Sequence, residues 1–335
     1  MKHILYSIAL VLTFSSCEKA FFDKEIKSTS PTENFEYLWN QCNTKYAFMD
    51  YKNINWDERH AYYKARINDG MTKEALFTEL ANMMNDLKDG HVNLVSNFNI
   101  SNYHFNFKGI NNINERIVDE FYLKADGVNG YSTGPFLHNF VGNGTVGYIR
   151  FKEFPGTVTD DQLDFIIDRY QNTKGLIIDV RQNGGGAVSD LWKMVSHLIS
   201  EKTLCYQTFT KNGPGRNDFE GPANAFAEPN GKTYTKKIYI LTDRGTFSSG
   251  SHFTLAMRNV PHAVIMGDTT GGGMGLPNGG QLPNGWTYRF SVTSTRDLDG
   301  SNFENGVPPD VISFINPSDS NKDAVIEAAI LEINK

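Results

Sequence analysis

Residues 175–186 read GLIIDVRQNGGG, an apolar run followed by a polar turn and three glycines. An apolar run without alternation is typical of a strand that is buried on both faces of a parallel sheet. The next segment, AVSDLWKMVSHLI (187–199), has the apolar spacing of an amphipathic helix. A buried strand, a sharp turn and a helix in this order predict an α/β fold.

The flanking sequence repeats this alternation. VGYIRF (146–151) and KIYILT (237–242) are predicted strands, whereas TDDQLDFIIDRYQN (159–172) and DAVIEAAILEIN (323–334) are predicted helices. We therefore expect one α/β domain over residues 146–335.

Two other patterns precede this domain. Residues 31–89 carry apolar residues at helical spacing, as in PTENFEYLWNQCNTKYAFM (31–49), and predict an N-terminal helical bundle. Residues 90–145 contain short aromatic or alternating runs, including ERIVDEFYLKA (115–125) and FLHNFVG (136–142). Such runs predict a small β segment between the two domains.

The first 30 residues have the pattern of an export signal and a tether. MKHILYSIALVLTFSSC (1–17) joins a short polar head to an apolar stretch that is too short to span a bilayer, then small residues and Cys17. Small residues directly before a cysteine resemble a bacterial lipoprotein cleavage site, with Cys17 as the acylated N-terminus. We therefore expect an exported chain that is anchored by lipid alone in the bacterial cell envelope, with residues 18–30 as a polar tether. A plain secretory signal is the alternative.

Composition excludes several classes of function. The chain has 335 residues, 39% of them hydrophobic, which suffices for a sizeable core. Its net charge of −6 and the lack of a basic block disfavour nucleic-acid binding. Scattered cysteines and histidines give no metal-ligand spacing, and GGGMG (271–275) precedes a hairpin pattern in place of the helix that a dinucleotide site needs. No metal or cofactor is expected.

TFSSGSHF (246–253) places three serines where a predicted strand gives way to a predicted helix. Hydroxyl residues in this position commonly cap the helix. The other interpretation is a nucleophile held at a strand-to-helix turn. Glycines 184–186 follow another predicted strand, and their unobstructed amides suit an oxyanion site. The residues alone do not decide which serine would react.

A nucleophilic serine needs a base, and His91 stands out among the eight histidines. It follows DLKDG (86–90) at the end of the helical segment and directly precedes VNLV (92–95). A histidine at such a junction can project into a cleft.

Five blocks of the sequence, taken in order, resemble the serine peptidase family that contains the C-terminal processing (tail-specific) peptidases and the tricorn protease core. The blocks are NDLKDGHVNLV (85–95), GLIIDVRQNGGG (175–186), LTDRGTFSSGSHFTLAM (241–257), VIMGDTTGGGMG (264–275) and ENGVPPDV (304–311). The resemblance implies a crotonase/ClpP-like catalytic domain of stacked strand–strand–helix units. It also implies a peptide or protein substrate.

The resemblance also implies roles for individual residues. The family's nucleophile matches Ser248, the third residue of TFSSGS (246–251). The amide of Ser249 and that of Gly184 or Gly185 would then form the oxyanion hole.

The residue expected to act as the base differs from the one that part of this family uses. Processing peptidases carry a lysine where this chain has Gly273, and residues 259–321 contain no lysine. The tricorn-like branch uses a histidine of a DGH block and a glutamate shortly before GVxPD, which match His91 and Glu304. The sequence therefore predicts a Ser248–His91–Glu304 triad that hydrolyses peptide bonds.

A second departure concerns substrate recognition. Only about 55 residues separate the DGH block from the first strand of the α/β domain, and no PDZ-like loop is evident among them. Because some relatives of this fold bind ligands without cleaving them, a non-catalytic peptide- or ligand-binding protein is the alternative function.

Overall fold

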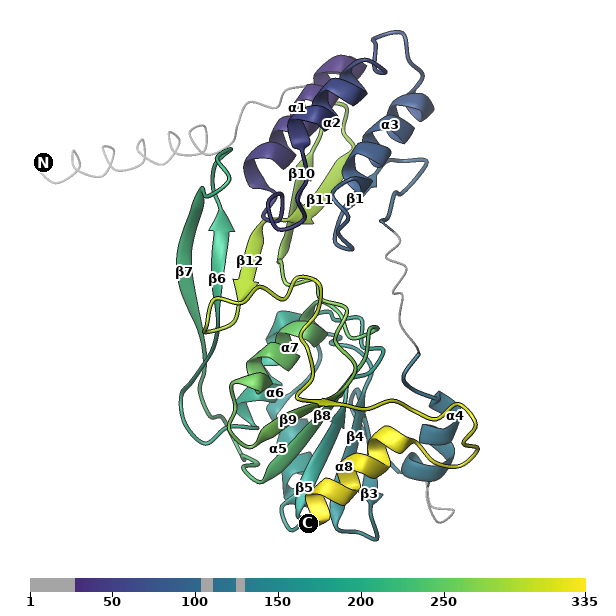
Figure 1. The fold of residues 1–335 in the computed structure, drawn as a ribbon, viewed down its shortest axis with the longest axis vertical. Coiled ribbons are helices and arrows are strands. Elements are labelled where there is room, and N and C mark those ends of the chain that lie inside the picture. The colour runs from purple at the N-terminus through teal and green to yellow at the C-terminus, as the bar shows by residue number, and fades with distance from the viewer. Residues whose placement is uncertain (1–27, 104–110, 125–129) are drawn as a thin grey trace, which may run out of the picture.

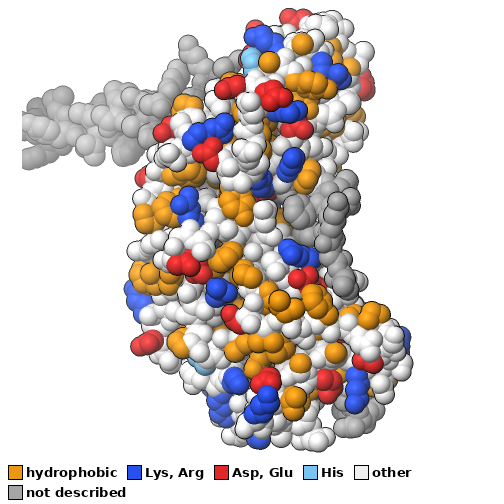
Figure 2. Space-filling model, viewed as in Figure 1, with side chains coloured by type: hydrophobic (Ala, Val, Ile, Leu, Met, Phe, Trp, Pro, Cys, Tyr) orange, Lys and Arg blue, Asp and Glu red, His pale blue; other side chains and the backbone are white. Residues whose placement is uncertain are grey.

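The computed structural model describes residues 28–103, 111–124 and 130–335 (Figure 1). The predicted signal peptide, its Cys17 and residues 18–27 of the predicted tether lie outside these ranges. Along the described ranges, no helix combines the length and the apolar character needed to cross a lipid bilayer. On the face shown in Figure 2, acidic and basic side chains are interspersed.

A seven-stranded sheet forms the centre of the larger part of the molecule. Its strands, in spatial order, are β13 (Val311–Ile312), β9 (Ala263–Gly267), β8 (Lys237–Thr242), β5 (Gly175–Asp179), β4 (Val146–Phe151), β3 (Phe136–Val141) and β2 (Tyr131–Thr133). The strands from β13 to β4 are parallel, and β3 and β2 extend the sheet in antiparallel pairing. The predicted α/β class is confirmed.

Helices cover both faces of this sheet (Figure 1). On one face pack α5 (Asp160–Tyr170), α6 (Val188–Ser196) and α7 (Ser249–Arg258), and on the other packs α8 (Ala324–Asn334). The strand β5 shows why the sheet needs two layers of helices. Its neighbours Ile177 and Ile178 are both buried, but they belong to apolar cores on opposite faces.

The N-terminal helices share a core with a three-stranded sheet, two strands of which come from the far end of the sequence. The helices are α1 (Pro31–Lys45), α2 (Trp56–Lys64) and α3 (Lys73–Asn85), and the strands are β1 (Asn93–Val95), β11 (Thr287–Ser291) and β10 (Pro277–Gln281). Leu80 and Met84 of α3 are buried in the same cluster as Tyr288 and Phe290 of β11. This N-terminal module therefore draws its residues from two distant parts of the chain.

Residues 90–145 differ from the predicted small β segment. The strand β1 pairs with β11, whereas β2 and β3 join the central sheet. The strand predicted over 115–125 is instead the helix α4 (Glu115–Val118) and a π-helical turn, Asp119–Leu123. The side chain of Asn114 caps this helix, and Val118 and Tyr122, one turn apart, are buried in the core that α8 covers.

A third sheet stands beside the junction of the two parts (Figure 1). It has the order β12 (Thr293–Arg296), β6 (Thr203–Lys211) and β7 (Phe219–Ala227), all antiparallel. The strand β12 follows β11 after a single residue, so that one stretch of chain runs from the N-terminal module into this third sheet.

Candidate active site

Ser248 occupies a strained turn between β8 and α7. Its φ of 54° and ψ of −120° are rare for a residue with a side chain and cost on the order of 1–3 kcal/mol. Two backbone hydrogen bonds hold the turn, from the Ser248 N–H to the Gly272 carbonyl and from the His252 N–H to the Ser248 carbonyl, both 2.9 Å. The Ser248 side chain does not cap the helix, so its hydroxyl is available for another partner.

That partner is His91. The His91 Nε2 lies 2.9 Å from the Ser248 Oγ, although the two residues are 157 positions apart. The His91 side chain is 8% exposed, and its ring packs against that of Phe247, with 4.9 Å between ring centroids. A hydroxyl in hydrogen-bond contact with an imidazole is the arrangement in which a serine can lose its proton as it attacks.

The other nitrogen of His91 faces Asp89 and Ser291. Its Nδ1 lies 3.8 Å from the Asp89 Oδ1 and 3.4 Å from the Ser291 Oγ. Asp89 is fully buried, its Oδ1 accepts the His91 backbone N–H at 2.8 Å, and its Oδ2 has no hydrogen-bond partner within the described residues. The place of Asp89 two residues before the histidine suggests that it positions the loop of His91, whereas the carboxylate predicted to support the imidazole is Glu304.

Glu304 lies near the serine turn but has other partners. Its Oε1 pairs with the Lys52 Nζ at 2.9 Å, and its Oε2 accepts the Met274 N–H at 2.7 Å. The Glu304 carbonyl also accepts the N–H of Gly273. Burial raises the pKa of Glu304 to about 7, against the opposing effect of Lys52. The structure thus binds Glu304 to Gly273 and Met274 of the 271–275 loop, and not to His91.

The surroundings of His91 favour its neutral form. Burial lowers the pKa of the imidazole below its ordinary value, and the positive charges of Arg289 and Lys52 act in the same direction. Asp89 opposes them by raising this pKa. At neutral pH the ring is therefore ready to accept a proton.

The glycine that stands in place of the family's lysine packs directly against this pair. A β-carbon at Gly273 would lie 2.5 Å from the Phe247 ring and 3.1 Å from the His91 Cε1. The φ of Gly273, +73°, also disfavours any other residue. The histidine and the phenylalanine thus fill the space that a side chain at 273 would need.

The glycine turn lies against the serine turn. A β-carbon at Gly185 would come within 2.8 Å of the Ser248 Cβ, and the Gly185 N–H donates to the Asn183 Oδ1 at 2.9 Å. Among the described residues, no acceptor pairs with the amides of Gly184 and Ser249. Two of the three predicted oxyanion donors are therefore unoccupied, and the third is already engaged.

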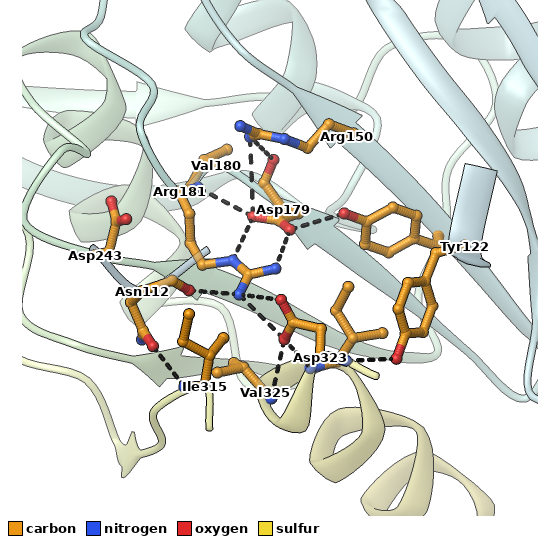
Figure 3. Close-up of polar contacts among 12 residues, drawn as sticks. Asn112, Tyr122, Arg150, Asp179, Val180, Arg181, Asp243, Ile315, Asp323 and Val325 are labelled. Atoms are coloured by element: carbon orange, nitrogen blue, oxygen red, sulfur yellow. Dashed lines mark hydrogen bonds and ion pairs between the residues drawn. The ribbon is translucent and has the colours of Figure 1, made fainter. Parts of the chain in front are cut away.

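A buried ionic cluster anchors the start of the glycine turn (Figure 3). Arg181 pairs with Asp179 at 2.6 Å and with Asp323, the N-cap of α8, at 2.9 Å. All three side chains are essentially inaccessible to solvent. Because Arg181 lies between the strand β5 and the glycines, its two ion pairs fix the direction in which the turn leaves the sheet.

A second polar contact joins the two turns. Gln182 donates its backbone N–H and its side-chain amide to the carboxylate of Asp243, at 2.8 and 2.7 Å. Asp243 belongs to the segment between β8 and Ser248, so the glycine turn and the serine turn are held together. Among the described residues, no group of three His, Cys, Asp or Glu side chains gathers as it would around a metal ion.

Comparison with known proteins finds matches to two family models. The model of peptidase family S41 matches residues 145–313, and the model of the tricorn protease C1 domain matches residues 28–85. The carboxy-terminal processing protease CtpB of Bacillus subtilis is 25% identical over 129 residues. That match covers 38% of this chain and 25% of the relative, so it spans about a quarter of the relative's length.

Two solved structures have the same fold over nearly the whole chain. A candidate peptidase from Parabacteroides merdae is 33% identical, with a TM-score of 0.85 over 92% of this chain and 98% of that one. The photosystem II D1 C-terminal processing protease is 14% identical, with a TM-score of 0.59 over 89% of this chain and 99% of that one. The second likeness concerns the fold alone.

Proposed function

Because this chain belongs to peptidase family S41, we propose that it hydrolyses peptide bonds with Ser248 as the nucleophile and His91 as the general base. The observation that carries the proposal is the 2.9 Å contact between the His91 Nε2 and the Ser248 Oγ at a strained strand-to-helix turn. The substrate is a peptide or a protein.

The reaction follows from the positions of these two groups. The Ser248 Oγ attacks the carbonyl carbon of the substrate while the His91 Nε2 takes its proton. The imidazolium then gives that proton to the leaving amine, which departs and leaves an acyl-enzyme. A water molecule, deprotonated by His91, attacks the acyl group, and the return of the proton to Ser248 releases the product.

The amides of Ser249 and Gly184 are the proposed donors to the oxyanion. They suit this role because neither donates to an acceptor among the described residues, whereas the Gly185 amide is held by Asn183. A donor of this kind typically lowers the barrier by about 3 kcal/mol.

The third residue of the proposed triad is a carboxylate that supports His91, and two candidates stand nearby. The sequence pattern favours Glu304, which would have to leave Lys52 and the Met274 amide to reach the imidazole. Asp89 already has an oxygen 3.8 Å from the Nδ1. Replacing each carboxylate by its amide and comparing the pH profiles distinguishes the two.

Labelling with a fluorophosphonate probe tests the nucleophile. The full chain should be modified at Ser248, and Ser248→Ala and His91→Ala should abolish the adduct as mapped by mass spectrometry. Ser132→Ala, a change at an exposed serine of β2, is the control that should label normally. A folded chain without an adduct would overturn the proposed nucleophile and leave the non-catalytic peptide- or ligand-binding protein as the alternative.

We also propose that the chain is exported and lipid-anchored through Cys17 in the bacterial cell envelope. The support is the order of polar, apolar and small residues before that cysteine. Expression of the full sequence in a bacterial host with a palmitate analogue should label the processed chain, in which Cys17 is the N-terminus. Cys17→Ser should remove both the label and membrane association, and unchanged labelling of that variant would contradict the proposal.

A further inference from the structure

A pocket of about 230 Å³ lies between the N-terminal module and the third sheet. Three distant segments line it, within residues 43–51, 211–219 and 294–302. Neither Ser248 nor His91 belongs to its wall. The pocket is therefore separate from the candidate active site.

Positive charge predominates in this wall. Lys211, Arg216 and Arg296 line the pocket, and Asp50 is the one acidic residue among the described lining residues. This excess stands in contrast to the net charge of −6 of the whole chain. Asp50 is already paired, since its Oδ1 lies 3.3 Å from the Arg216 Nε.

Lys211 is also satisfied by its surroundings. The side chain is buried, and its ammonium donates to the carbonyls of Gly213 and of Gly215, the second at 2.6 Å. Burial lowers the pKa of Lys211, and Asp218 nearby opposes this effect. Asp218 is itself engaged, because it accepts the N–H of Gly215 at 2.6 Å.

Among the cations of this wall, Arg296 keeps a buried N–H donor without a hydrogen-bond acceptor among the described residues. Its guanidinium stacks on the ring of Phe209, 4.5 Å from the centroid, and forms no ion pair with any described carboxylate. The Arg296 Nε is buried and has no hydrogen-bond acceptor within the described chain. Leaving such a buried polar group unpaired is unfavourable, and a carboxylate suits the fork of an arginine well.

We propose that this pocket binds a carboxylate carried by a peptide, either an acidic side chain or a free C-terminus, with Arg296 as its main partner. The inference rests on the peptidase function proposed above, because that function supplies peptides to this part of the molecule. Ser294 and Asn302 in the wall are neutral hydrogen-bonding groups, so they add polarity without opposing an anion.

The pocket is connected to the serine turn through the strand β12. Successive residues of a strand point to opposite faces, and Thr295 lies between the lining residues Ser294 and Arg296. The Thr295 Oγ1 lies 3.1 Å from the His252 Nε2, and the His252 Nδ1 lies 3.0 Å from the Ser248 carbonyl oxygen. One strand therefore separates the pocket from residues that hold the nucleophile.

Fluorescence anisotropy with the full-length Ser248→Ala variant tests the inference, because this variant binds peptides without cutting them. The probes are octapeptides of one alanine-rich sequence, labelled at the N-terminus with a BODIPY dye, which is neutral and carries no carboxylate. They carry an internal Glu or Gln, each with a free or an amidated C-terminus. We expect peptides with a carboxylate to bind at least tenfold more tightly than the neutral one.

The added Arg296→Gln change should abolish this preference, whereas Arg66→Gln, at an exposed arginine paired with Glu79 on α3, should keep it. If the Glu peptides bind more tightly, the pocket recognises an acidic side chain. If the peptides with a free C-terminus bind more tightly, the pocket recognises the end of the chain. Equal binding of all four peptides, or a preference that survives Arg296→Gln, would overturn the proposal that this pocket binds a carboxylate through Arg296. An absence of labelling at Ser248 would overturn the peptidase function alone.

Discussion

Asp89 touches His91 at two points, since its Oδ1 accepts the backbone N–H at 2.8 Å and lies 3.8 Å from the ring Nδ1. The same carboxylate thus holds the backbone of the loop and raises the pKa of the imidazole. Of the described acidic side chains, no other lies within ion-pair distance of that ring.

Asp89→Asn keeps an acceptor for the backbone N–H but removes the charge. We expect kcat/KM for a peptide to fall by roughly a hundredfold, at the low end of what acid–base catalysis contributes. The acid limb of its pH profile should move to lower pH, because Asp89 raises the pKa of His91. Glu304→Gln is the matched change, and a limb that moves in that variant alone would assign the orienting role to Glu304.

Lys52→Gln should shift the acid limb of the kcat/KM profile in the direction opposite to that of Asp89→Asn. Lys52 lowers the pKa of His91, so its loss should raise that pKa and move the acid limb to higher pH. Lys52→Arg retains the charge and serves as the control. Profiles of kcat/KM between pH 4 and 8 measure both variants, and equal shifts in the two would exclude an effect of charge.

Gly273→Ala should disable the site because its β-carbon would meet Phe247 and His91. We expect loss of fluorophosphonate labelling and a drop of about 1–3 kcal/mol in the free energy of unfolding. Gly144→Ala is the matched control, since it also has a positive φ, +83°, but no neighbour within 4 Å. If both variants label equally, contact between a side chain at position 273 and His91 does not affect the reactivity of Ser248.

Asp323→Asn should destabilise the fold from a distance. Asn can still cap α8, but Arg181 loses one of its two buried carboxylate partners. Breaking a buried pair typically costs about 3–5 kcal/mol, which urea unfolding would measure. Glu228→Gln, which removes the exposed partner of Lys202, should leave the unfolding midpoint unchanged. A small effect of Asp323→Asn would mean that Asp179 alone satisfies Arg181.

The raised pKa of Glu304 predicts a pH dependence of stability. Its folded value of about 7 exceeds its ordinary value of 4.5, so the folded state holds this proton more tightly than the unfolded state. The stability that this proton contributes is complete below pH 4.5 and is lost as the pH rises through 7. Urea unfolding at pH 5 and pH 8 should show a smaller decrease for Glu304→Gln than for the unmodified chain.

Local patterns predicted the central part of the fold. The continuous apolar run of β5 correctly indicates burial on two faces, and the hydroxyl-rich turn after β8 correctly precedes a helix. The pairing of His91 with Ser248 was inferred from the family resemblance, because no local pattern reports a contact across 157 residues.

The points at which the structure differs from the sequence predictions also have physical causes. The β-branched and aromatic residues of 115–123 suggest a strand, but the Asn114 cap and the Arg116–Glu120 pair, four residues apart, favour the helix that forms. The partners of Glu304 depend on Lys52, which arrives from the loop after α1. Such a contact is set by tertiary packing and leaves no trace in spacing.

The shared core of the N-terminal module has a consequence for the order of events during synthesis. Helices α1 to α3 are made first, but Tyr288 and Phe290, against which they pack, follow about 200 residues later. A growing chain therefore carries His91 on an incomplete module until the last strands appear. The module that carries His91 to Ser248 therefore reaches its complete core only after residues up to Phe290 have been made.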